Sequence, residues 1–313
     1  MSPTAERPSP DLTGVFSVLP TPFDAEGRVD VASLRKVVDL FLAAGVDGLT
    51  ALGVTSEVAR LSERERALVL ETVIEQVGGR VPVVAGTTAD GLMACLELSR
   101  QAEAAGAAAI MVSPPRLPKL GSEAVLAHYR ALAEGVGLEI VVQDYPPVSG
   151  FTMEAALLAR IAREVPPART IKLEDPPTPF KVERILAHCD GIPVRIFGGL
   201  GGVFLLEELM AGAAGAMTGF AYPEMLVAVV SEFRAGRLAR AADLFYRYVP
   251  LMRFEFQEGL GMAIRKEVLR RRGALAHAGV RAPGAVLDAG TQAALDLLLA
   301  WVKEKQGAPW ICV

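Results

Sequence analysis

The sequence contains few of the residues from which disulfide frameworks and metal sites are built. Its 313 residues include only three cysteines and three histidines. Cys95, Cys189 and Cys312 are odd in number and far apart, which matches neither a disulfide framework nor the spacing of metal ligands. We therefore predict no metal and no other cofactor, and a reducing, cytoplasmic location in which the cysteines act as small apolar side chains.

The sequence also lacks a strong net charge and an uninterrupted apolar segment long enough to span a membrane. The net charge of −4 offers no basic surface to nucleic acid or to an anionic membrane. The apolar stretch 212–230 is interrupted by Pro223, Glu224 and several glycines, which divide it into a strand, a turn and the start of a helix. Residues 1–12 are rich in proline and polar groups, so we expect a disordered lead-in and no signal peptide. The prediction is a soluble protein without nucleic-acid or membrane partners.

Hydrophobic residues, in contrast, make up 51% of the chain, enough for a large core. Short continuous apolar runs, typical of buried parallel strands, alternate with segments of helical periodicity. One predicted strand carries Lys172, and the other seven cover residues 14–19, 46–52, 81–85, 107–112, 138–142, 194–197 and 214–218. Eight such units in roughly 220 residues favour a closed (β/α)8 barrel over a doubly wound sheet.

A helical tail is predicted to follow the barrel without a flexible linker. Its helical segments cover residues 238–253, 258–272 and 291–304. The predicted organisation is therefore a lead-in at 1–12, a barrel at 13–233 and a C-terminal helical extension at 234–313. The second tail segment contains a basic cluster that we expect on a solvated or subunit-facing surface: Arg265, Lys266, Arg270, Arg271 and Arg272.

Lys172 is the most informative residue of the sequence. It lies in a short apolar strand that stops at Pro176, and strand alternation places Lys172 and Glu174 on the face opposite Ile171 and Leu173. A lysine in such a strand either reaches water or is desolvated, and a desolvated amine is a usable nucleophile. An exposed lysine at a strand end is the simpler interpretation, but other strand ends carry unusual residues too.

The carboxyl ends of the strands meet at one mouth of a (β/α)8 barrel, where active sites lie. The turn Gly53–Glu57 offers backbone amides and two hydroxyls that suit a carboxylate, with Glu57 itself in a structural role. Tyr145, two residues beyond Gln143, either shuttles protons or caps the barrel rim. The catalytic candidates are Lys172, Tyr145 and Glu174. The substrate-binding candidates are Val54, Thr55, Ser56, Gln143, Gly198, Gly199 and Met217.

From Gly14 to the helical tail, the sequence resembles the dihydrodipicolinate synthase / N-acetylneuraminate lyase superfamily of Schiff-base aldolases. Four segments in order carry the resemblance: 19–23 (LPTPF), 53–57 (GVTSE), 145–150 (YPPVSG) and 171–172 (IK). The resemblance implies an eight-unit barrel with a helical extension, usually a homotetramer. It also implies that Lys172 forms a Schiff base with pyruvate or another 2-oxo acid, whose carboxylate Thr55 would hold.

The sequence departs from the family pattern where the synthases handle protons and the second substrate. Gln143 stands where the family has its relay tyrosine, and Val148 where synthases have an arginine. Pro115 and Arg116 replace a tyrosine pair. We therefore predict a divergent member that is not a dihydrodipicolinate synthase. Three functions stay open: an aldolase or lyase acting on a 2-oxo acid, a dehydratase of a 2-oxo-3-deoxy sugar acid, and a silent barrel that binds 2-oxo acids.

Overall fold

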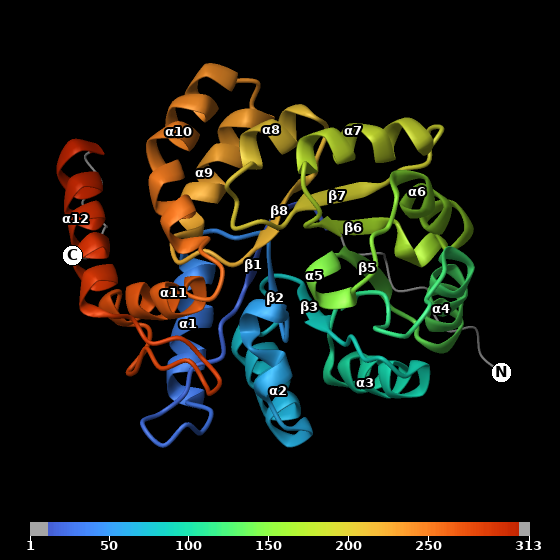
Figure 1. Ribbon diagram of the computed structural model, residues 1–313, viewed down its shortest axis with the longest axis horizontal. Helices are drawn as coiled ribbons and strands as arrows, with labels where there is room; N and C mark the ends of the chain where they lie inside the picture. Colours follow the sequence, from blue (N-terminus) through green and yellow to red (C-terminus); the bar gives the residue numbers. More distant parts are fainter. Residues whose placement is uncertain (1–11, 307–313) are drawn as a thin grey trace.

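The strands form a closed parallel barrel in the computed structural model, which describes residues 12–306 (Figure 1). Each strand pairs with the next, and β8 returns to β1, with Gly215 opposite Gly14. The strands are β1 (Gly14–Val18), β2 (Gly48–Ala51), β3 (Val83–Gly86), β4 (Ala109–Val112), β5 (Glu139–Asp144), β6 (Thr170–Leu173), β7 (Arg195–Gly198) and β8 (Gly215–Thr218). The predicted (β/α)8 architecture is confirmed.

Helices surround the barrel on its outer face (Figure 1). They are α1 (Val31–Ala43), α2 (Glu63–Val77), α3 (Leu92–Ala105), α4 (Ser122–Gly135), α5 (Pro146–Ser149), α6 (Ala155–Glu164), α7 (Thr178–His188), α8 (Leu205–Met210) and α9 (Pro223–Arg234). The capping box expected at the start of α2 is present: the Glu65 amide donates to Ser62 Oγ, and the Ser62 amide donates to Glu65 Oε2. The short α5 was not predicted; prolines open it, and Gly150 ends it with φ +68°.

The core has two parts, one on each face of the barrel wall. The larger part lies between strands and helices and contains Cys95 and Cys189, both buried free thiols as expected. The smaller part fills the barrel interior with Leu12, Phe16, Val84, Ala109, Met111, Val141, Phe197 and Met217. The predicted lead-in lies outside the described residues except for Leu12. That residue is fully buried, so the prediction of disorder is wrong there.

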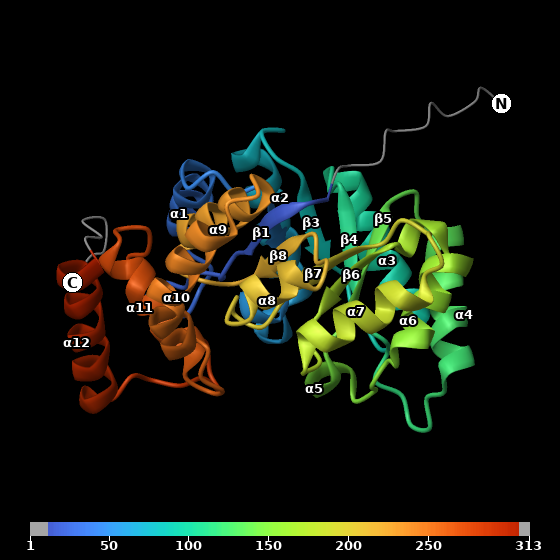
Figure 2. The same cartoon turned by 90° about the horizontal axis from the view of Figure 1, so that it is seen from above.

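Three further helices continue from the barrel: α10 (Leu238–Glu255), α11 (Gly261–Arg271) and α12 (Ala289–Gln306). In Figure 2, α10 and α11 lie against one side of the barrel, and α12 lies outermost. Within residues 12–306, no helix is both long and apolar enough to cross a membrane. The basic cluster of α11 was predicted on the surface, and this is wrong for Arg265 and Lys266, because both are buried against carboxylates.

Candidate active site

A small cavity of about 70 Å³ lies at the carboxyl ends of the strands. Residues at the ends of five strands, β2, β5, β6, β7 and β8, and two residues of the C-terminal extension meet there. The residues that line it are Val54, Thr55, Tyr145, Lys172, Glu174, Gly199, Leu200, Gly201, Thr218, Gly219, Phe256 and Arg265. Six of the ten residues singled out in the sequence line this cavity: Val54, Thr55, Tyr145, Lys172, Glu174 and Gly199.

Lys172 and Glu174 form a buried ion pair in the cavity wall. Lys172 Nζ lies 3.0 Å from Glu174 Oε2, and the two residues are 4% and 8% exposed. β6 places Lys172 opposite Gln143, whose Nε2 donates to the same Glu174 oxygen at 2.7 Å. Gln143 is itself oriented by Ser113, whose hydroxyl donates to Gln143 Oε1 at 3.1 Å. Sequence reasoning missed Ser113, although it directly follows the fourth strand.

The loop after β7 can approach this pair only because it has no side chain at Gly199. A Cβ there would lie 2.4 Å from Glu174 Cγ and 3.0 Å from Lys172 Cε. Thr218 fixes the loop: it donates to the Gly199 carbonyl at 2.8 Å and accepts from the Gly201 amide at 2.9 Å. Thr218, from β8, was not among the predicted site residues.

In the turn after β2, Val54 and Thr55 line the cavity, whereas Ser56 does not. The Ser56 hydroxyl donates to the Leu19 carbonyl at 2.5 Å and accepts from the Gly53 amide at 3.1 Å. Ser56 therefore holds the turn together from behind. Glu57 is buried, in the left-handed conformation, and ion-paired with Lys266.

Four predicted substrate-binding residues do not line the cavity. Ser56 faces the turn, and Gln143 lies behind Glu174. Gly198 borders another buried acid, because a Cβ on it would lie 1.6 Å from Glu208 Oε2. Met217 is packed in the barrel interior because strand alternation turns it toward Phe16 and Phe197.

Tyr145 lines the cavity from a position just beyond β5, which ends at Asp144. Burial raises the pKa of its phenol, and the charges of Glu174 and Glu258 raise it further. The phenol is therefore protonated at neutral pH and can donate a proton or a hydrogen bond.

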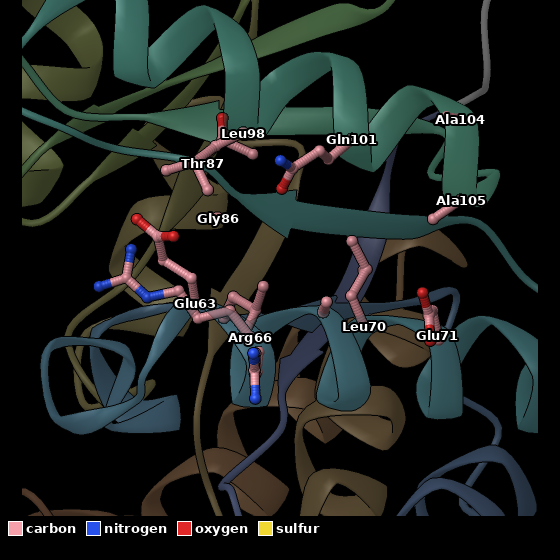
Figure 3. A pocket seen from close by; sticks show the side chains of 13 residues that line it. Glu63, Arg66, Leu70, Glu71, Gly86, Thr87, Leu98, Gln101, Ala104 and Ala105 are labelled. Atoms are coloured by element: carbon pink, nitrogen blue, oxygen red, sulfur yellow. The ribbon is translucent and has the colours of Figure 1, made fainter.

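A larger cavity than this one lies elsewhere in the described chain. It measures about 570 Å³ and lies between α2 and α3, where Glu63, Arg66 and Leu70 face Leu98 and Gln101 (Figure 3). It shares no lining residue with the Lys172 cavity. Size alone does not mark a reactive site, and we place the chemistry in the smaller cavity, because the buried lysine–carboxylate pair lies there.

Residues 11–301 match the profile of the Dihydrodipicolinate synthetase family. The chain belongs to this family. It is 32% identical to L-2-keto-3-deoxyarabonate dehydratase of Azospirillum brasilense, over 92% of this chain and 93% of the relative. It is also similar to the crystal structure of dihydrodipicolinate synthase from Rhodopseudomonas palustris, with 34% identity, a TM-score of 0.88, and coverage of 95% and 99% of the two chains.

A second structural neighbour is a family member of E. coli K12, a prophage protein solved in complex with pyruvate. Its TM-score is 0.86 at 25% identity, and the match covers 93% of this chain and 99% of that one. The predicted resemblance is thereby confirmed, and the protein is an enzyme of the lyase class and a divergent member of its family.

Proposed function

We propose that this lyase dehydrates a 2-oxo-3-deoxy sugar acid through a Schiff base on Lys172. The observation that carries the proposal is the buried pair of Lys172 Nζ and Glu174 Oε2, 3.0 Å apart in the cavity wall. The amine is the nucleophile, and the carboxylate beside it is the proton carrier. The relative from Azospirillum brasilense, whose name states such a dehydration, and the neighbour solved with pyruvate both support the assignment.

The proposed reaction begins when the Lys172 amine adds to the C2 carbonyl and water leaves, which forms an iminium. Glu174 then takes a proton from C3, and the electron pair of that C–H bond flows into the iminium to give an enamine. The enamine expels the C4 hydroxyl, which receives the proton and departs as water. Hydrolysis of the remaining conjugated iminium releases the product and the free amine, so the net change is the loss of one water.

Dehydration is preferred to aldol cleavage, the first of the functions left open by the sequence, because the relative from Azospirillum brasilense is named for a dehydration. Both reactions need a group that exchanges a proton with the C4 hydroxyl, an acid for dehydration and a base for cleavage. The family's relay tyrosine aligns with Gln143, whose amide does not titrate and instead donates to Glu174. Proton transfer is thereby assigned to Glu174, beside the imine nitrogen, with Tyr145 as the second candidate.

The substrate carboxylate is assigned to the turn after β2. Thr55 lines the cavity there, and its hydroxyl can donate a hydrogen bond to an anion. With the carboxylate held at Thr55 and C2 bound to Lys172, the sugar-acid chain points toward the remaining wall of Leu200, Gly201 and Phe256.

Borohydride trapping tests the Schiff base. The protein is incubated with pyruvate and with a panel of 2-oxo-3-deoxy sugar acids, reduced, and mapped by peptide mass. One adduct on Lys172 is expected, and none on Lys181, a second lysine held by Asp144 and Asp175. Absence of any adduct on Lys172 with every acid contradicts the proposal. Without reductant, loss of water from the sugar acid indicates a dehydratase, release of pyruvate an aldolase, and trapping without turnover a silent binder.

We also propose a homotetramer in the cytoplasm. The mean hydropathy of +0.35 is high for a monomer whose whole surface would be exposed to water. α12 exposes two large apolar side chains, Leu297 and Trp301, at 74% and 43%. The buried free thiols of Cys95 and Cys189 suit a reducing compartment.

A further inference from the structure

The C-terminal extension contributes a charged side chain to the cavity. Arg265 lies on α11, yet it is only 5% exposed, and it lines the same cavity as Lys172 and Thr55. Lys172 already has a carboxylate partner in the cavity wall, Glu174.

Arg265 is held rigidly from one side. Its Nε donates to Glu255 Oε1 at 2.5 Å, and the other oxygen of Glu255 accepts from the Ala221 amide at 3.1 Å. Glu255 is itself 5% exposed, so the two charges are buried together. This contact fixes the plane of the guanidinium and leaves its opposite edge directed elsewhere.

One nitrogen on that edge has no partner. Arg265 Nη1 is buried and makes no hydrogen bond within the described part of the chain. A Cβ on Gly219 would lie 1.9 Å from Nη1 and 3.1 Å from Thr55 Oγ1, so the guanidinium fills the place that a side chain at Gly219 would take, and its Nη1 lies close to the Thr55 hydroxyl. A buried cationic donor without an acceptor is costly, which indicates a place made for a ligand oxygen.

We propose that Arg265 Nη1 and Thr55 Oγ1 together bind the carboxylate of the 2-oxo acid, which makes Arg265 a specificity-determining residue supplied by the C-terminal helices. The assignment rests on the proposed function. A carboxylate offers two oxygens to two neighbouring donors whose residues line the same cavity, and a guanidinium donor makes a short, charge-assisted hydrogen bond to it. The enzyme then selects acids over uncharged ketones at this point, and removal of the extension would destroy the carboxylate site as well as the cover of the barrel.

The test uses two variants, because loss of Arg265 alone would leave the buried Glu255 without its ion-pair partner. Arg265→Lys keeps a cation beside Glu255 but lacks Nη1, the donor proposed to bind the carboxylate. The pair Arg265→Met with Glu255→Gln removes both charges together. The matched control is Arg270→Lys on the same helix, where the side chain is 46% exposed and paired with Glu267.

Calorimetric dissociation constants are measured for pyruvate and for pyruvamide, the same ketone with an uncharged amide. We expect both Arg265 variants to bind pyruvate roughly 10- to 100-fold more weakly, as for loss of a hydrogen bond to a charged group. Their affinity for pyruvamide should stay within about threefold of the parent, and Arg270→Lys should match the parent for both ligands. Unchanged pyruvate affinity, or an equal loss for both ligands, overturns the proposal.

Borohydride trapping of the same proteins separates the two claims. A parent protein without an adduct on Lys172 refutes the Schiff base, whereas the comparison of acid with amide still reports on Arg265. A parent that traps pyruvate, with Arg265 variants of unchanged affinity, refutes only the carboxylate assignment.

Discussion

Replacement of Glu174 by glutamine tests the centre of the proposed mechanism. Of the described residues that line the cavity, Glu174 is the one carboxylate, and a single oxygen of it faces both Lys172 Nζ at 3.0 Å and Gln143 Nε2 at 2.7 Å. Glutamine has the same shape and can still accept from Gln143 through its carbonyl oxygen. The variant therefore loses the ability to take up a proton while the cavity wall keeps its packing.

The expected loss follows from the size of acid-base assistance. A positioned side chain that transfers a proton contributes about 100- to 10,000-fold to the rate. At about 1.4 kcal/mol for each factor of ten, this corresponds to roughly 3 to 5 kcal/mol of barrier. Because two contacts already orient the carboxylate next to the amine, we expect Glu174→Gln to slow elimination at least roughly 100-fold. Imine formation should survive, because Lys172 is unchanged.

The assay is a single-turnover measurement of water loss, made after trapping has shown that Lys172 still forms its imine. Tyr145→Phe is measured in parallel, since Tyr145 is the other proton carrier in the lining. The matched control is Asp175→Asn, one residue further along the chain, where the carboxylate pairs with Lys181 on α7. If Glu174→Gln eliminates water at the parent rate, the proton moves by another route. If Asp175→Asn slows elimination as much as Glu174→Gln does, the loss of rate reflects general destabilisation and not proton transfer by Glu174.

Three further outcomes are expected. Thr55→Val should weaken binding of a 2-oxo acid roughly 10- to 100-fold in calorimetry without changing the melting temperature by more than a few degrees, and equal affinity would move the carboxylate elsewhere. Burial raises the pKa of Glu208 from 4.5 to about 7, so the stability that its protonated form contributes is complete below pH 4.5 and is lost as the pH rises through about 7. In denaturant unfolding, the free energy of unfolding of the parent should fall by roughly 3 kcal/mol over this pH range, and that of Glu208→Gln should not. If the two proteins lose stability equally as the pH rises, Glu208 is not the group responsible. Light scattering at micromolar concentration should report a tetramer, and a 33.2 kDa particle would contradict this.

The local pattern of the sequence was enough to predict the barrel and the face of β6 on which Lys172 lies. Buried parallel strands are apolar on both faces, so they are visible as short runs separated by helical periodicity. Strand alternation also placed Lys172 and Glu174 on one face, although β6 ends at Leu173 and Glu174 lies just beyond it. The backbone keeps the alternating direction of its side chains for one residue beyond the strand, so Lys172 and Glu174 lie on one face as predicted.

Which other residues join the lysine was decided only by the tertiary structure. Arg265 and Lys266 are part of a basic run that is typical of a solvated helix face, but α11 packs this side on the barrel mouth, where Glu255 and Glu57 neutralise them. Glu57 lies far from Lys266 in the sequence, and the charge of a lone residue does not indicate its distant partner. Ser56 shows the reverse case, because its hydroxyl was expected at the substrate and instead binds the Leu19 carbonyl. Periodicity determines which way a side chain points along its own element, whereas what it meets there depends on how the chain closes on itself.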